Sequence, residues 1–275
     1  MPNMLIKDLR AIAGGLPEDV KEWPDIPCPT CGRGSLSSVT GTFVMEESET
    51  SKRWQAEQWD HWEPDWIHGG FHCVLRCGKS TCDLVRVTGE MRLVAEQDER
   101  GHWDGQSWVH EFRPLFFHPA LPLLQTHEAA PEVVLQRVSA ASAVLWADPS
   151  SAANRLRSAV EALMDDQGIP RKGSGRRGPF DLTLHKRIEN LASAKPAYSD
   201  AAEMILAVKW IGNVGSHEDA LKVSNVLDGA EILDFVLTEI YDKSRDSIKR
   251  LAAEITARKG APAARYIPGT NLLNL

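Results

Sequence analysis

The chain contains 275 residues, of which 43% are hydrophobic and 25% are charged. These values are typical of a globular protein with room for two modest domains. The formal net charge of -7 argues against a broad positive surface for nucleic acid, because phosphate neutralisation needs clustered lysines and arginines. No segment has the length of a membrane span and the N-terminus lacks a signal-peptide pattern, so we expect a cytoplasmic protein without membrane contact.

Several short segments of the first half alternate between hydrophobic and polar residues or are rich in β-branched residues. They are residues 36–45, 71–77, 83–96 and 102–117. We predict an antiparallel β-rich domain over residues 1–118. A β-hairpin excursion inside this domain is expected to carry a cluster of tryptophans suited to core packing and to docking a protein: Trp54, Trp59, Trp62 and Trp66.

The pattern changes after a proline-rich connection at 118–131. Apolar residues then recur at helical spacing, and we expect five helices at 131–147, 151–168, 181–193, 199–213 and 223–258. A basic, glycine-rich loop between the second and third helices is expected to be solvated. Helices joined by short loops form a bundle. The predicted fold class is therefore α+β, with a β-rich domain over 1–118 and an all-α bundle over 130–258.

All five cysteines lie in the first half, where two pairs have the spacing of a metal site. Reduced thiols grouped in this way bind metal more often than they form disulfides. We predict one structural zinc ion bound by four thiolates, a closed arrangement without a catalytic position: Cys28, Cys31, Cys77 and Cys82. Cys73 precedes Cys77 by four residues and is an alternative to it as a ligand. His61, His68 and His72 are weaker alternatives.

Polar side chains on two of the predicted helices form the second candidate site. Arg157 and Glu161 are one helical turn apart, as are Lys209 and Asn213, and His217 follows Asn213 at the same spacing. These five residues are candidate catalytic groups. In the alternative interpretation Arg157 pairs with Glu161, Asn213 caps its helix and His217 is hydrogen-bonded within the bundle.

Four stretches of the second half resemble the family called domain of unknown function 4145, over residues 130–245. They are SAANRLRSAVEALMDDQGI, LTLHKRIENLA, ILAVKWIGNVGSHED and VLDGAEILDFVLTEIY. The CPTCG motif with its later cysteine pair resembles the zinc-ribbon segment that precedes this domain in many bacterial proteins. That family is similar to the HEPN superfamily, compact helical domains of bacterial defence systems, restriction subunits and toxins, many of them metal-independent endoribonucleases.

Active HEPN nucleases carry an arginine followed after four to six residues by a histidine, often at a dimer interface. The resemblance places Asn213 and His217 on this motif, and Gly212 at the position of the arginine. It implies a homodimer formed through a HEPN-like domain, which acts as an interaction or accessory component of a restriction or anti-phage defence system and binds a protein partner or RNA. The alternative is an endoribonuclease in which His217 transfers protons and Lys209, Arg157 or Arg155 stabilises the transition state.

Overall fold

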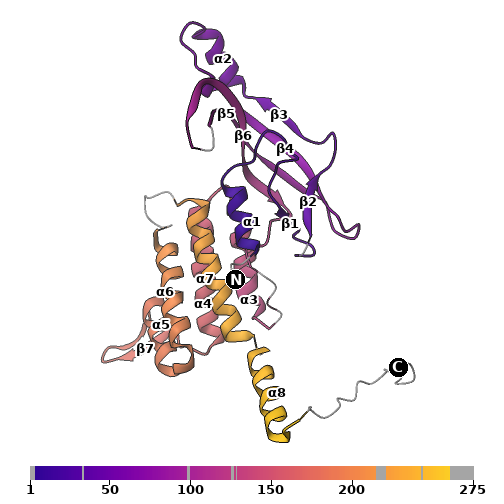
Figure 1. The fold of residues 1–275 in the computed structure, drawn as a ribbon. Helices are drawn as coiled ribbons and strands as arrows, with labels where there is room; N and C mark the ends of the chain where they lie inside the picture. The colour runs from indigo at the N-terminus through magenta and orange to yellow at the C-terminus, as the bar shows by residue number, and fades with distance from the viewer. Residues whose placement is uncertain are drawn as a thin grey trace, which may run out of the picture.

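The computed structural model describes residues 4–32, 34–97, 100–124, 127, 129–214, 221–242 and 244–260. Figure 1 shows a curled sheet in the N-terminal half and a group of helices in the C-terminal half. This arrangement confirms the α+β class. Among the described residues, no helix is both long and apolar enough to cross a membrane.

The sheet is antiparallel, with strand order β1-β2-β4-β5-β6, and β3 pairs with β4 as well. The strands are β1 (Ile26–Pro27), β2 (Ser35–Ser38), β3 (Val44–Glu47), β4 (His68–Cys77), β5 (Val85–Gln97) and β6 (Trp103–His118). Phe71, Cys73, Leu75 and Cys77 of β4 are buried, whereas His72 and Arg76 between them are exposed. This period of two places the core on one face of the sheet, as the sequence pattern predicts.

Two helices of the N-terminal half were not predicted: α1 (Met4–Ala13) and α2 (Glu49–Glu57). Helix α2 and the 3₁₀ turn η1 (Pro64–Trp66) replace the expected β-hairpin excursion and carry tryptophans on its path. A capping signal explains the difference, because the Ser48 side chain accepts a hydrogen bond from the Ser51 backbone N–H at 3.1 Å. Local capping therefore starts a helix where the composition suggested strands.

The C-terminal half contains α3 (Glu132–Ser142), α4 (Pro149–Asp166), α5 (Leu184–Ala194), α6 (Ser199–Val214), α7 (Val223–Tyr241) and α8 (Ser244–Arg258). Helix α4 is central and packs against α3, α5, α6 and α7. Its predicted apolar face, which includes Leu156, Val160 and Leu163, is fully buried.

Two expectations for the helical half differ from the structure. The predicted last helix is divided into α7 and α8, because Asp242 has extended backbone angles and ends α7. The glycine-rich loop after α4 is a β-hairpin of β7 (Lys172–Gly175) and β8 (Gly178–Asp181), which projects beside α5 in Figure 1. Short glycine-rich strands show no alternating hydrophobic pattern, so the sequence does not reveal them.

Two contacts join residues before the bundle to α7. The Arg10 guanidinium of α1 donates to Asp228 at 2.6 Å and to Glu231 at 3.0 Å. His127, in the connection after β6, lies 2.7 Å from an oxygen of Asp234, and both side chains are largely buried. Helix α1 also contacts β1 and β6, so it lies between the sheet and the bundle.

Candidate metal centre and polar pocket

Four cysteines converge where two turns of the sheet meet. Cys28 and Cys31 lie in the turn between β1 and β2, Cys77 ends β4, and Cys82 lies in the turn before β5. Strands β2 and β4 are paired, with Leu36 opposite Cys77, and this register places the two turns side by side. Pairs that are far apart in the sequence are therefore brought to one point.

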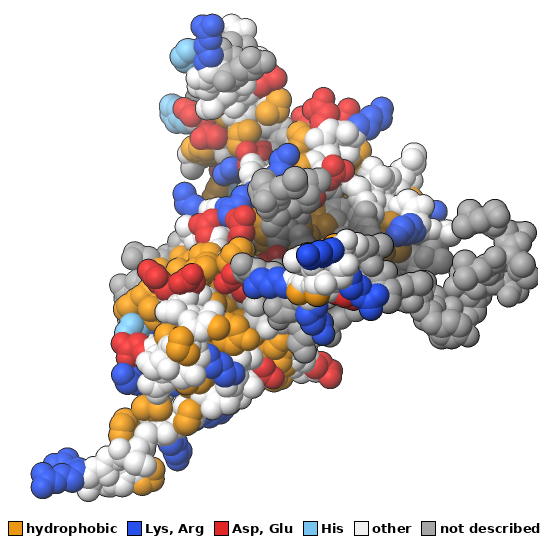
Figure 2. Space-filling model, turned by 60° about the horizontal axis from the view of Figure 1, so that its bottom comes forward, with side chains coloured by type: hydrophobic (Ala, Val, Ile, Leu, Met, Phe, Trp, Pro, Cys, Tyr) orange, Lys and Arg blue, Asp and Glu red, His pale blue; other side chains and the backbone are white. Residues whose placement is uncertain are grey.

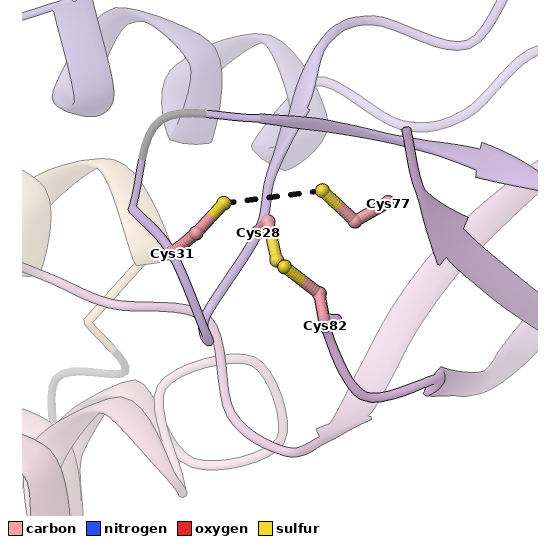
Figure 3. A group of neighbouring side chains, drawn as sticks. All are labelled: Cys28, Cys31, Cys77 and Cys82. Atoms are coloured by element: carbon pink, nitrogen blue, oxygen red, sulfur yellow. Dashed lines mark hydrogen bonds between the residues drawn. The ribbon is translucent and has the colours of Figure 1, made fainter. Parts of the chain in front are cut away.

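The four sulfur atoms all lie within 4.8 Å of one another. Cys31 Sγ and Cys77 Sγ are 3.9 Å apart, and Figure 3 shows the side chains from both turns pointing toward one another. Two of the four residues are buried and two are half-buried. Four thiolates so close together are compatible with a single metal ion that they enclose.

The backbone around the first pair is shaped to hold these sulfurs. The Gly32 N–H donates to the Cys28 carbonyl at 2.8 Å, and Gly32 has a φ of 61°, which glycine adopts without strain. A Cβ added to Gly34 would lie 2.6 Å from Cys77 Sγ, so a larger residue cannot occupy this position. The Lys79 N–H approaches Cys77 Sγ at 3.5 Å and stabilises negative charge on it.

Cys73 does not join this cluster. Its buried sulfur lies 3.8 Å from Thr42 Oγ1, and it pairs across the sheet with Val87. Burial raises the pKa of the Cys73 thiol above its usual value. The structure therefore brings together the four predicted ligands and leaves Cys73 in the hydrophobic core. No histidine of the described residues belongs to the cluster.

The predicted polar residues of the helical half meet in a second place. Arg157 from α4, and Lys209 and Asn213 from α6, line one pocket of about 430 Å³ together with Thr183, Leu184, His185 and Trp210. Glu161 does not line this pocket, but its Oε1 lies 3.3 Å from an Arg157 nitrogen. His217 lies outside the described residues, so the structure does not place it.

Helices α4 and α6 cross closely at Gly212. A Cβ added there would lie 2.6 Å from Arg157 Cβ and 3.1 Å from the Ala153 carbonyl oxygen. Residue 212, where the resemblance to the HEPN motif would place the arginine, thus has no room for a side chain. An arginine side chain at residue 212 would force the two helices apart.

Asp165 holds α5 beside α4 and thereby fixes one wall of the pocket. It accepts hydrogen bonds from Arg171 and from the buried Arg187, the latter at 2.6 Å. Arg187 also donates to the Ile169 carbonyl at 2.8 Å. The guanidinium groups, first that of Arg171 and then that of Arg187, lower the pKa of the Asp165 carboxyl to about 2.

Several residues of these sites were not predicted from the sequence, among them Gly34, His185 and Trp210. Gly34 has a recognisable signal, because glycines near a cysteine pair often permit a close approach to sulfur. His185 and Trp210 have none, because a histidine or tryptophan on an amphipathic helix is common. Only the packing of α5 against α6 places them beside Arg157 and Lys209.

Together these features define an α+β protein with a cluster of four cysteines compatible with a metal site in its sheet and a polar pocket in its helical bundle. Residues 139–258 match the family described as domain of unknown function 4145, which confirms the resemblance of the helical half. Residues 18–117, which contain the cysteine cluster, match the family described as domain of unknown function 8608. Comparison with curated proteins and with solved structures gives no match.

Proposed function

We propose that the protein is a bacterial, cytoplasmic, zinc-binding component of a restriction or anti-phage defence system, in which it acts through contacts with a partner. The proposal further gives it a HEPN-like helical domain that holds a homodimer. One observation favours this function over catalysis at the metal site of the sheet. The four thiolates enclose the metal position, and the sheet that they stabilise presents exposed tryptophans at its far end.

Zinc fits the cysteine cluster by distance and by charge. A tetrahedral zinc with Zn–S bonds of about 2.3 Å separates its sulfurs by about 3.8 Å. The observed separation of Cys31 Sγ and Cys77 Sγ is 3.9 Å. Burial and the neighbouring sulfurs raise the pKa of the Cys82 thiol to about 12. A divalent cation offsets this cost of deprotonation, since it binds thiolates and displaces their protons.

We call two groups of tryptophans, one in and around α2 and η1 and one on β6, the tryptophan surface: Trp54, Trp59 and Trp66, and Trp103 and Trp108. Trp59 is 76% exposed, and Trp54 and Trp103 are also exposed. The rings of Trp103 and Trp108 pack edge to face with centroids 5.2 Å apart, so part of this surface is preorganised. Acidic side chains interleave with the tryptophans and repel a phosphate backbone: Asp60, Glu63 and Asp65. The surface therefore favours a protein partner over nucleic acid.

A phage-challenge experiment tests this proposal. We expect cells that carry the gene with its native neighbours to reduce phage plating, and deletion of the gene to restore plating. A double variant, Trp59→Ser with Trp103→Ser, should lose protection while it keeps its fold and its zinc. The matched control is Ile248→Ser, which removes an exposed apolar side chain from α8. Deletion without any effect on plating contradicts the defence role, and full protection by the double variant contradicts the role of the tryptophan surface.

A metal-independent HEPN-type endoribonuclease is the second candidate function. The observation that favours it is the shared pocket of Arg157, Lys209 and Asn213, whose cations could stabilise a phosphorane. In this candidate His217 is the general acid or base. Purified protein incubated with structured and unstructured RNA in EDTA should cleave it, and His217→Ala should abolish cleavage. Intact RNA, or cleavage unaffected by His217→Ala, rejects this function.

A further inference from the structure

The N-terminus of α5 opens into the pocket between α4, α5 and α6. Thr183 is the N-cap, and its hydroxyl accepts a hydrogen bond from the Lys186 N–H at 3.2 Å. Leu184 and His185, the first residues of the helix, line the pocket. The first N–H groups of a helix have no partner inside it and carry the positive end of the helix dipole. They are suited to bind an anion such as phosphate.

Lys209 supplies an independent reason to expect an anion there. It lines the same pocket although it is only 8% exposed. Its Nζ lies 3.3 Å from the centroid of the Trp210 ring, and within the described part of the chain no carboxylate forms an ion pair with it. A buried ammonium without a carboxylate partner has hydrogen-bond donors that a bound anion can accept.

Arg157 and His185 add donors to the same cavity. Arg157 Nε and His185 Nδ1 are both buried, and neither has a hydrogen-bond partner among the described residues. The Arg157 guanidinium is held from one side by Glu161, and the other ring nitrogen of His185 lies 3.4 Å from Glu189. These two carboxylates orient the Arg157 and His185 side chains and do not themselves line the pocket.

Trp210 stands between this cationic pocket and an apolar one. It is 56% exposed, and with Asn213 it also lines a neighbouring cavity of about 520 Å³ with Ile211, Val214, Leu221 and Asn225. An accessible indole stacks on any nucleobase, and side-chain amides can hydrogen-bond to base edges. The two cavities thus place a phosphate site and a base site on either side of one tryptophan.

A basic arm leads into the same site. Hairpin β7–β8 ends two residues before α5 and presents Lys172, Arg176 and Arg177, all exposed. Figure 1 shows this hairpin projecting from the bundle, and Figure 2 shows basic side chains at the end of the corresponding arm, with hydrophobic side chains gathered over the helices beside it. In a chain with a net charge of -7 this is a local concentration of positive charge.

We propose that this pocket binds a phosphate and its attached nucleoside, with the phosphate at the α5 N-terminus, Lys209 and Arg157, and the base stacked on Trp210. The source is single-stranded nucleic acid, whose backbone continues along the β7–β8 arm, or a free nucleotide. The inference shares residues with the endoribonuclease candidate but rests on binding alone. Binding without cleavage supports it and rejects the nuclease.

Fluorescence anisotropy with a short labelled oligouridylate tests the proposal on the full-length protein. Trp210→Ala should weaken binding about fivefold or more, because base–indole stacking contributes at least that ratio. Phe235→Ala on α7, which removes another exposed aromatic ring, is the matched control and should leave binding unchanged. The double variant Arg176→Ser with Arg177→Ser should reduce the slope of log affinity against log salt by about 1.4, or about 0.7 for each phosphate contact in a single strand.

Competition experiments identify the chemical group and its source. Uridine monophosphate should displace the oligouridylate where uridine does not. Lys209→Met should remove this difference between the two competitors, and its circular dichroism spectrum should show that the fold is unchanged. Tighter binding of the oligonucleotide than of the mononucleotide identifies a strand as the ligand, and equal binding identifies a free nucleotide. Equal competition by uridine and its monophosphate overturns the proposal. Equal affinity of the wild type and Trp210→Ala for the oligouridylate also overturns the proposal.

Discussion

Replacing Cys77 with serine removes one of four thiolates that join two turns of the sheet. Cys31 and Cys77 are separated by 46 positions in the chain, so a metal between them closes a loop of that length. The chain-entropy expression for a cross-link of this size corresponds to about 4 kcal/mol at room temperature. Since small domains unfold with a free energy of only about 5–15 kcal/mol, this is a large fraction of the stability of the sheet.

Urea unfolding with saturating zinc or with a strong chelator measures this contribution. We expect the chelator to lower the unfolding free energy of the wild type by about 4 kcal/mol. Cys77→Ser should have the lower value already and should not respond to the chelator. Cys73→Ala is the matched control, because Cys73 is buried on the same strand outside the cluster. It should retain the full chelator response.

Two results would refute this reasoning. The first is an equal chelator response in the wild type and Cys77→Ser, which would mean that no metal joins the turns. The second is a lost response in Cys73→Ala, which would assign the ligand to the other cysteine. Metal analysis of the purified protein should give one zinc per chain, and its absence would reject the site altogether.

Three further predictions concern packing and charge. Gly212→Ala should destabilise the bundle by about 1–2 kcal/mol in urea unfolding, because the clash with Arg157 outweighs the better helix propensity of alanine. Asp165 has a pKa lowered to about 2 by its arginine partners, so its contribution is present above the unfolded value of about 3.9 and is lost as pH falls toward 2. Because this side chain is 33% exposed, we expect about 1 kcal/mol, and Asp165→Asn should flatten the stability profile between those pH values. Arg10→Ala should cost no more than about 1 kcal/mol, with a smaller effect at high salt, since its pairs with α7 are exposed.

The four cysteines show what the spacing of residues in the sequence can predict about a metal site and what it cannot. Two cysteines separated by two or four residues share a turn, so each pair could be recognised without any long-range information. The choice between Cys73 and Cys77 could not be made in this way, because alternation in a strand places both side chains on the same face of β4. Strand register decides it. Cys77 is opposite Leu36 beside the first turn, whereas Cys73 lies four residues, or about 13 Å, further along the strand.

The sequence by itself determined the α+β class, the apolar face of α4 and the closely spaced cysteines as candidate ligands, because these depend on periodicity and short spacing. Only the tertiary structure decided that His185 and Trp210 join Arg157 and Lys209 in one pocket, and that Gly212 is pressed against α4. Such contacts depend on how helices from distant parts of the chain cross. That geometry is set by the packing of whole helix faces, and no short stretch of sequence contains it.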